Sequence, residues 1–439
     1  MPMPREKEWY RLDNAGVLYS ALKKEKYAPV YRFSAVMTDK VDQSALQRAV
    51  DRTMPRFPSF RVRFRKGAFW CYFEPNNKPG PFVRPDISNP CQPMRDKGDN
   101  DWLVRFYYYE NRISFEAFHG LSDGGGAMVL FRTVLAEYLR ERGMDIPPDP
   151  LILDVAQPPR AEELEDAYGR YAGKRALRGG LKKTAYSNTS QREPFYTLNV
   201  TMGLMSVADL KAKAKEHGAT ITEYLTAVLL LTLLEKQRDE RPHREKPVAL
   251  AIPVNLRGWF PSETLRNFML TLRPCVDPAL GEYTLDDLIR YVRHYMGLHL
   301  NRQEMRSTIT GNVKFTRNRA LQMVPLFIKK PVMAFSYWLV GVRPYTATFT
   351  NPGAFQLPAA MKPHIQRMEV ILGQATRPSP HCAAISCGDV MEITFAGTGV
   401  SSETERRFFT HLVREGVPVK VISNRAAGRL PGWSFGKAE

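Results

Sequence analysis

The feature that most constrains the fold is a run in which a histidine ends a strand and glycines open a helix. Residues 118–126 read Phe-His-Gly-Leu-Ser-Asp-Gly-Gly-Gly. The alternating apolar residues of 112–118 predict a strand before this run, and the apolar spacing of 127–142 predicts a helix after it. His119 then lies at a strand end, and Asp123 follows four residues later. Such a strand–turn–helix unit is typical of an α/β protein.

The residue types in this run suit proton transfer. A neutral imidazole is the natural general base near pH 7. A fixed carboxylate close behind it can hold the backbone or the tautomer of that base. From the run alone a structural interpretation stays open, in which Asp123 caps the helix and His119 only packs.

Composition indicates a globular protein with an ample core. Of the 439 residues, 44% are apolar and 25% are charged, and a chain of this length favours two to three domains of about 150 residues. No stretch reaches the roughly 18 uncharged apolar residues of a membrane span. The N-terminus lacks the apolar core of a signal peptide. We therefore expect a cytoplasmic protein, and we expect it to be a monomer.

Neither the cysteines nor the histidines are spaced as metal ligands. The chain has five cysteines, whose scattered positions match no zinc site or redox pair. The eight histidines do not cluster with carboxylates at ligand spacing. We expect no bound metal, and we expect mostly buried, reduced thiols.

The positive charge points to anionic partners. The net charge is +18 and the pI is about 9.7, and such a field attracts polyanions. A phosphorylated co-substrate, an acidic acyl carrier protein and an anionic membrane all qualify. The basic residues are spread out and no nucleic-acid motif is present, so no specific nucleic acid is expected. The apolar segment 321–342, which contains Lys329 and Lys330, leaves peripheral membrane contact open, although a core or lid segment is the favoured interpretation.

The chain divides into two similar halves. Residues 155–195 are polar with few apolar anchors, as in a linker. We place a first domain at 1–160, a crossover linker at 161–195 and a second domain at 196–439. In both halves a tight hairpin precedes a helix. Aligning the halves puts Gly399 opposite His119, so that only the first half keeps a histidine.

Two further runs agree with a catalytic interpretation of His119. Residues 252–257 read Ile-Pro-Val-Asn-Leu-Arg and are followed by Leu-Arg-Asn-Phe at 265–268, and residues 348–353 read Thr-Phe-Thr-Asn-Pro-Gly. Alone, Arg257 would suggest a surface ion pair, and the last run would suggest a turn. In this order, however, the chain resembles the chloramphenicol acetyltransferase-like superfamily over nearly its whole length. That superfamily includes condensation domains of peptide synthetases, wax ester synthases and alcohol acetyltransferases, and the bacterial alcohol acetyltransferase-like proteins are the most similar.

The resemblance implies two α/β sandwich domains that form a pseudo-dimer with a tunnel between them. It implies an acyltransferase that moves an acyl group from a CoA or phosphopantetheine thioester to an alcohol or amine acceptor. Donor and acceptor are expected to enter the tunnel from opposite faces. No permanently bound cofactor is expected.

The resemblance also implies roles for individual residues. His119 matches the general base. Asp123 matches a residue that holds the loop and pairs with an arginine, for which Arg257 is the candidate. Gly124 is expected to allow a close turn beneath the histidine, and the Thr350 hydroxyl is expected to donate to the oxyanion. The remaining matches to the structural motifs are Asn267, Asn351 and Gly353.

One departure from the family pattern and two alternative functions bear on this interpretation. Pro352 stands where relatives carry a small or apolar residue, which puts the local backbone of that turn in doubt. A non-catalytic protein that binds acyl groups, lipids or a carrier protein on the same scaffold remains an alternative, although the retained His119 and Asp123 favour the enzyme. The second alternative, a serine or cysteine nucleophile, has little support. No Gly-x-Ser-x-Gly elbow occurs. His381 and Cys382 are neighbours in an expected strand, so their side chains point to opposite faces and do not form a catalytic pair.

Overall fold

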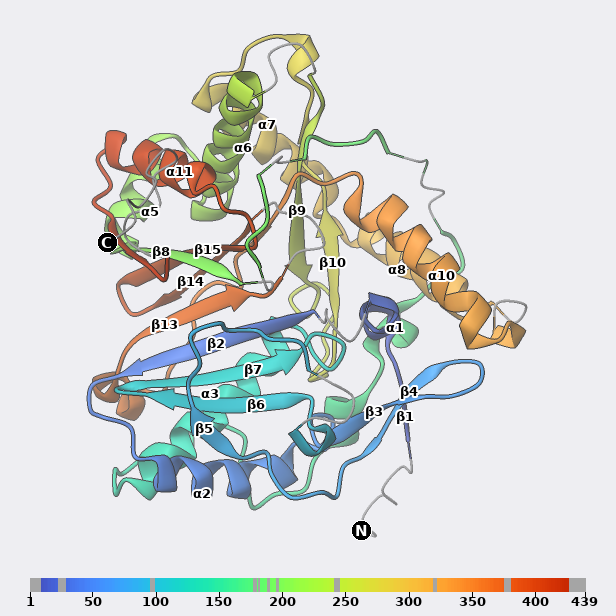
Figure 1. Cartoon of the computed structure of the whole chain (residues 1–439), viewed down its shortest axis with the longest axis vertical. Coiled ribbons are helices and arrows are strands. Elements are labelled where there is room, and N and C mark those ends of the chain that lie inside the picture. The colour runs from blue at the N-terminus through green and yellow to red at the C-terminus, as the bar shows by residue number, and fades with distance from the viewer. Residues whose placement is uncertain are drawn as a thin grey trace, which may run out of the picture.

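The computed structural model describes most of the chain as two sheets with helical covers and a small third sheet (Figure 1). The predicted boundary at 195–196 lies outside the described residues, as do the N-terminal residues that were tested for a signal peptide. The described residues are 9–22, 29–94, 99–176, 180, 182–187, 190–194, 197–240, 245–318, 322–374 and 380–425.

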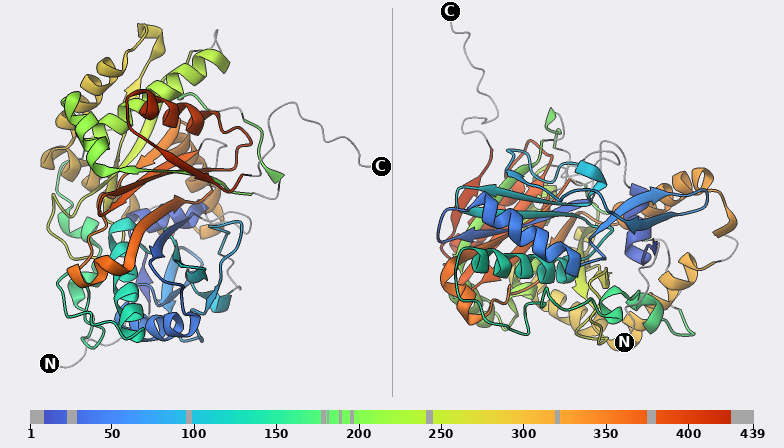
Figure 2. Two further views of the ribbon diagram at one scale, coloured as in Figure 1. Left: turned by 90° about the vertical axis from the view of Figure 1, so that its left-hand side faces the viewer. Right: turned by 90° about the horizontal axis from the view of Figure 1, so that it is seen from below.

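A five-stranded sheet forms the first half. Its order is β13 (Ile365–Leu372), β2 (Val30–Met37), β7 (Arg112–Phe118), β6 (Val104–Tyr109) and β5 (Val83–Pro85). The β6–β7 hairpin predicted from alternation is confirmed, with Tyr109 opposite Arg112. Helices α2 (Gln43–Thr53) and α3 (Gly124–Glu141) lie along one face of this sheet (Figures 1 and 2).

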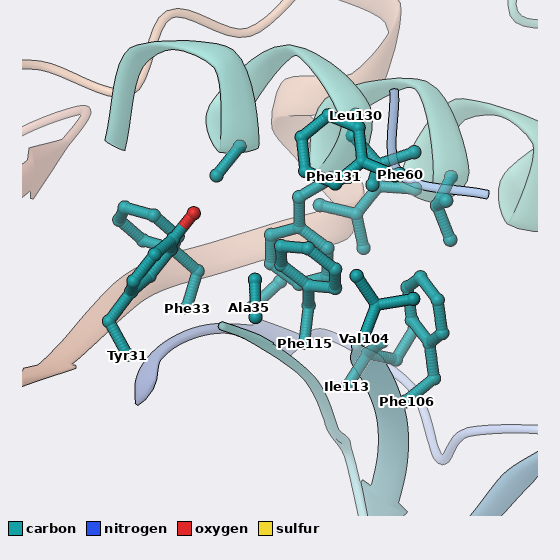
Figure 3. Close-up of a cluster of buried hydrophobic side chains, with 14 of the residues drawn as sticks. Tyr31, Phe33, Ala35, Phe60, Val104, Phe106, Ile113, Phe115, Leu130 and Phe131 are labelled. Carbon is teal, nitrogen blue, oxygen red and sulfur yellow. The ribbon is translucent and has the colours of Figure 1, made fainter. Parts of the chain in front are cut away.

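An aromatic core joins α3 to the sheet. Phe115 on β7 stacks on Phe131 of α3, with ring centroids 5.8 Å apart, and Phe106 on β6 lies 5.2 Å from Phe115 (Figure 3). These side chains are fully buried. Since burying an aromatic side chain contributes about 1.5–3 kcal/mol, this cluster fixes α3 against the sheet. It thereby fixes the turn that connects β7 to α3.

The second half contains a larger sheet. Its order is β10 (Met269–Leu272), β9 (Val248–Asn255), β12 (Ala347–Thr350), β14 (His381–Cys387), β15 (Val390–Gly397), β8 (Asn199–Ser206) and β16 (Lys420–Ser423), and β11 (Cys275–Val276) also pairs with β9. Four helices flank it in Figure 1: α5 (Val207–Glu216), α6 (Ile221–Glu240), α7 (Leu285–His299) and α11 (Glu403–Arg414).

The predicted helix caps of this half are confirmed. Ser206 accepts from the backbone N–H of Asp209 at the start of α5. Thr220 and Glu223 cap α6 reciprocally, each side chain accepting from the other's backbone N–H. Such a capping box fixes where the helix begins.

Strand β13 links the two halves. It lies within the range 196–439 that was predicted for the second domain, yet it pairs with β2 of the first sheet from Ile365 to Leu372. It also touches the second sheet, because the Val370 N–H donates to the buried Glu392 carboxylate on β15. The first sheet is therefore built from both ends of the chain.

Helices α1 (Asn14–Leu22), α8 (Arg302–Thr316) and α10 (Leu326–Tyr337) lie together at one side of the molecule. A three-stranded sheet of β1 (Tyr10–Arg11), β4 (Cys71–Pro75) and β3 (Val62–Lys66) lies beside them (Figure 1). The short elements are η1 (Met54–Arg56), η2 (Asp99–Asp101), η3 (Ala161–Leu164), α4 (Ala167–Tyr171), η5 (Pro278–Leu280), η6 (Trp338–Val342) and η7 (Ala359–His364).

The segment 321–342 was expected to be a core or lid segment; its core interpretation is wrong, and its lid interpretation stays a prediction. Residue 321 lies outside the described residues, and no side chain of α10 or η6 is buried. An apolar run suggests burial only when another element covers it, and here one face is left uncovered.

Membrane-spanning length was also tested. Within the described part of the chain no single helix is both long and apolar enough to cross a membrane. Helices α5 and α6 meet such criteria only together, as a pair bent by 77°.

Candidate active site

His119 lies between two tyrosines at the end of β7. Its backbone N–H donates to the Pro29 carbonyl at 2.9 Å, which holds the strand end beside β2. Tyr19 of α1 stacks on the imidazole with ring centroids 4.2 Å apart, and Tyr31 meets it edge-on at 5.0 Å. The Tyr19 hydroxyl is 3.3 Å from Nε2. The ring is thus held in place, and Nε2 faces a hydroxyl group.

Burial makes this imidazole a neutral group at neutral pH. Burial lowers the pKa of His119 below its ordinary value of 6.5, because the charged imidazolium loses its hydration. Its own backbone, the negative charge of Asp123 and the side chain of Asn267 oppose this change but do not reverse it. A neutral imidazole can accept a proton, as a general base must.

Asn267 and Asp13 support the turn from the other side. Asn267 Nδ2 donates to the Gly120 carbonyl and to Asp13 Oδ2, each at 3.4 Å. Asp13 Oδ1 accepts from the Gly16 N–H at 2.7 Å. Burial raises the pKa of Asp13 to about 6, although the nearby Arg266 opposes the shift. Asp13 was not found from the sequence, since nothing in its local pattern differs from an ordinary helix cap.

Asp123 uses both carboxylate oxygens to hold the backbone and an arginine. Oδ1 caps α3 by accepting from the Gly126 N–H at 3.1 Å. Oδ2 accepts from the Phe268 N–H at 2.6 Å and from Arg257 Nη1 at 2.9 Å. The sequence made Arg257 the candidate partner of Asp123, and the structure joins the two side chains.

Arg257 is itself fully engaged. Its guanidinium donates to the Thr264 carbonyl from Nε and Nη2, to the Arg266 carbonyl at 2.7 Å and to Asn255 Oδ1 at 3.2 Å. The side chains of Arg257 and Asp123 are only 17% and 6% exposed. This pair fastens the start of α3, in the first half, to the β9–β10 connection of the second half.

The glycine that this junction requires is Gly126. A Cβ there would lie 2.0 Å from the Leu265 carbonyl oxygen and 2.4 Å from Ser122 Oγ. A Cβ at Gly125 would lie 2.9 Å from Arg257 Nη1. At Gly124, where a close approach was predicted, a Cβ would meet only Phe33 at an ordinary 3.6 Å. The tight contact therefore falls two residues later than predicted.

The second predicted run forms an ordered turn at the end of β12. Asn351 Oδ1 accepts from the Gly353 N–H at 3.0 Å, and Asn351 Nδ2 donates to Thr222 Oγ1 at the start of α6 at 3.1 Å. Gly353 has a φ of +86°, which favours glycine. The turn contains Pro352 without losing these bonds, so the local backbone that was in doubt is well defined.

One cavity of about 260 Å³ collects the predicted chemical groups. His119, Gly124, Thr350 and Asn351 line it, together with the edge of Asp123. Arg257, Asn267 and Gly353 do not line it and instead support residues that do. Asn255 of the 252–257 run also lines it. Lining residues to which the sequence gave no site role include Tyr19, Tyr31, Met128, Met269, Tyr337, Gln374 and His381.

His381 is the most informative of these additional residues. It begins β14, next to Thr348 in the parallel β12–β14 pair. Burial lowers its pKa to about 4, and its Nδ1 has no hydrogen-bond partner among the described residues. The neutral ring lines the cavity, so it can contact a bound substrate. The register with β12 would have revealed it, but register is not readable from one sequence.

The same search extends to metal ions. In the described ranges no three side chains of the metal-binding types lie close enough together to hold an ion.

The sequence is similar to one known family over part of its length. Residues 178–269 match the sequence profile of the alcohol acetyltransferase family. Among curated protein sequences none matches the chain.

Solved structures match almost the whole chain. Polyketide synthase associated protein 5 from Mycobacterium tuberculosis has 15% identity, with 93% of this chain and 98% of that protein covered and a TM-score of 0.59. F. graminearum TRI101, complexed with coenzyme A and T-2 mycotoxin, has 10% identity, coverages of 94% and 99%, and a TM-score of 0.63. The starter condensation domain of rhizomide synthetase, in complex with C8-CoA, has 13% identity, coverages of 93% and 95%, and a TM-score of 0.56.

At such low identities the structural similarity establishes the fold. The chain has the α/β fold of the chloramphenicol acetyltransferase-like superfamily, and the resemblance predicted from its sequence is confirmed. The tunnel and the pseudo-dimer relation of the halves remain predictions, as do the domain boundaries.

The consecutive glycines allow a matched test of this junction. We expect Gly126→Ala to lower the free energy of unfolding by about 1–3 kcal/mol, because its Cβ overlaps a backbone carbonyl. Gly124→Ala should change stability by at most about 1 kcal/mol, in the stabilising direction that alanine favours in a helix. Urea unfolding monitored by circular dichroism measures both, and equal losses for the two variants would contradict the packing described.

Proposed function

We propose that this chain, with the fold of an acyltransferase superfamily, transfers an acyl group from a CoA or carrier-protein thioester to an alcohol or amine. The observation that carries the proposal is a neutral, sterically fixed imidazole at His119, lining one cavity together with the Thr350 side chain. The alcohol acetyltransferase match at residues 178–269 supports the acceptor class.

The first step uses His119 as general base. Nε2 removes the proton of the acceptor's hydroxyl or amino group while the acceptor's oxygen or nitrogen attacks the thioester carbonyl carbon. This forms a tetrahedral intermediate with a negative oxygen, and the proton resides on the imidazole. The low pKa of His119 keeps the ring unprotonated and ready for this step at neutral pH.

The second step expels the thiol. The Thr350 hydroxyl donates a hydrogen bond to the negative oxygen of the intermediate. A donor of this kind lowers the activation barrier by about 2.7–4 kcal/mol. The carbon–sulfur bond then breaks, the carbonyl reforms, and the imidazolium returns its proton to the departing thiolate. The products are an ester or amide and the free thiol, and His119 is again neutral.

Tyr19 indicates where the acceptor binds. Its hydroxyl is 3.3 Å from His119 Nε2, close to the position that an acceptor's hydroxyl would have to take, at about 2.6–3.2 Å from this nitrogen, for proton transfer. An acceptor therefore shifts Tyr19 or binds beside it. The neutral ring of His381 lines the same cavity and offers a further contact for the acceptor.

The choice of donor rests on charge and on similar structures. The net charge of +18 favours a donor that carries phosphate, either free CoA or the phosphopantetheine arm of an acidic carrier protein. TRI101 was complexed with coenzyme A and the rhizomide condensation domain with C8-CoA. By the same reasoning we propose that CoA thioesters bind here as co-substrates.

Loss of the base should abolish most of the activity. We expect His119→Ala to reduce acyl transfer by about two to four orders of magnitude while the fold survives. The matched control is His294→Ala, which removes an exposed histidine of α7. A panel of acyl-CoAs with alcohol and amine acceptors, analysed by mass spectrometry, measures the products. Undiminished transfer by the first variant would exclude His119 as the base. If neither the wild-type chain nor the variant forms product, the non-catalytic alternative is favoured.

The pH dependence should report the same imidazole. Because burial lowers the pKa of His119 below 6.5, the neutral base persists to lower pH than a free histidine, and the rate falls only when the pH drops through that lowered pKa. We expect the acidic limb of kcat/KM to have its midpoint below 6.5. A midpoint at or above 6.5 would contradict the assignment.

Two substitutions separate the hydroxyl of Thr350 from its shape. Thr350→Val keeps the branched shape but removes the donor, and we expect kcat to fall by about 10²–10³-fold. Thr350→Ser keeps the hydroxyl and should retain most of the rate. If both variants lose the same activity, Thr350 acts through packing and not as an oxyanion donor.

A further inference from the structure

One face of α10 is apolar and uncovered. Phe327 is 77% exposed, Val332 59% and Phe335 62%, and Trp338 at the helix end is 45% exposed. These positions recur every three to five residues, so they fall on one side of the helix. Phe335 and Trp338 stack with ring centroids 5.9 Å apart. A helix on the surface of a globular protein normally carries polar residues on this side.

Neighbouring elements extend this face. The tip of the β3–β4 hairpin is joined to α10, because the Leu326 N–H donates to the Ala68 carbonyl and Lys329 Nζ donates to the Phe69 carbonyl. In Figures 1 and 2 the hairpin and α10 lie together at the edge of the molecule. We call the whole surface the α10 patch; its exposed apolar residues are Phe69, Trp70, Phe315, Met323, Phe327, Ile328, Val332, Phe335, Trp338 and Val340.

The charged residues of the segment that contains α10 have one sign. Between Glu304 and Glu369 the sequence contains no aspartate or glutamate. The lysines and arginines on α8, on α10 and after η6 form no salt bridge within the described residues, although Lys314, Lys329 and Arg343 donate to backbone carbonyls. These cations are Lys314, Arg317, Lys329, Lys330 and Arg343. An apolar face beside cations that have no carboxylate partner is complementary to a surface that is apolar inside and anionic at its edge.

We propose that the α10 patch docks on an anionic phospholipid membrane. The exposed Phe and Trp side chains enter the boundary between headgroups and acyl chains, while the bordering Lys and Arg side chains contact lipid phosphates. The helix lies in the plane of the surface and does not span it. This surface contact is separate from the acyl-transfer chemistry proposed above.

Charge and composition favour a membrane over other occupants. A second copy of this chain would bring its own charge of +18 against the same cations, which opposes self-association. An acidic carrier protein would satisfy the cations, but the patch offers a broad row of phenylalanine and tryptophan side chains without polar groups between them. A hydrocarbon phase under an anionic surface satisfies both features.

Behind the patch lies a second cavity, of about 390 Å³, lined mostly by apolar side chains. The residues of α10 that line it include Met333 and Val332, and those of α1 include Val17. Tyr337, at the end of α10, lines the cavity of His119. The helix that touches the membrane in this proposal therefore also borders the interior of the protein. Asp166 supplies the carboxylate among the described residues that line the second cavity.

Co-flotation with lipid vesicles tests the proposal. The full chain is mixed with vesicles of phosphatidylcholine alone or of phosphatidylcholine with phosphatidylglycerol. We expect flotation with the anionic vesicles and weaker flotation with the neutral ones, and we expect binding to fall as salt is added. In Phe327→Ser with Phe335→Ser, the partition coefficient should fall by about tenfold or more, since two apolar side chains no longer insert.

Matched variants separate this face from general stickiness. Leu280→Ser with Val413→Ser removes two apolar side chains that are 82% and 54% exposed on η5 and α11, and it should leave flotation unchanged. Lys330→Glu should weaken binding to anionic vesicles several-fold, whereas Lys211→Glu on α5 should not. Thermal unfolding verifies that every variant is folded.

Any of four results would overturn the proposal. The first is no flotation of the wild-type chain with anionic vesicles. The second is equal flotation of the Phe327/Phe335 and Leu280/Val413 variants. The third is a wild-type dimer that the Phe327/Phe335 substitutions convert to monomer, which would mean that a second copy covers the patch. Binding of an acidic carrier protein in place of vesicles would assign the surface to that partner.

Discussion

The ion pair between Asp123 and Arg257 is the contact on which the rest of the site depends. It joins the first turn of α3 to the connection between β9 and β10, and the buried Gly126 permits the two backbones to meet. A buried pair of this kind contributes little net stability when complete, but losing one partner costs about 3–5 kcal/mol because a charge is left without compensation. Every oxygen and nitrogen of the pair that we describe is bonded, so the pair specifies one relative position of the two segments.

This arrangement divides the work differently from a hydrolase triad. In a triad the carboxylate bonds to the imidazole and stabilises its charged form. Here both oxygens of Asp123 are taken by Gly126, Phe268 and Arg257, and within the described residues no hydrogen bond joins Asp123 to His119. Burial lowers the pKa of His119, and the two tyrosines fix its ring. The imidazole is thus a weak base whose usefulness lies in its position.

Local signals in the sequence predicted local structure well. The hairpin before His119, the Ser206 cap and the Thr220–Glu223 box are encoded by neighbouring residues, and the structure contains them. Long-range pairings were not predictable. His381 reaches the cavity because β14 lies parallel to β12, and β13 joins β2 across most of the chain. The core interpretation of segment 321–342 failed because hydropathy alone does not tell a covered helix from an uncovered one. The catalytic roles, the cytoplasmic location and the monomeric state stay predictions.

The shared strand β13 has a consequence for how this molecule can be divided. The first sheet takes its edge strand from residues 365–372, and that strand is held in turn by Glu392 of the second sheet. A fragment that ended at the linker would expose β2 as a bare edge with unpaired backbone groups, which invites aggregation. Expressing the halves as independent pieces would therefore fail unless both were present to reassemble. The two lobes are therefore tied together by a strand that neither can supply alone.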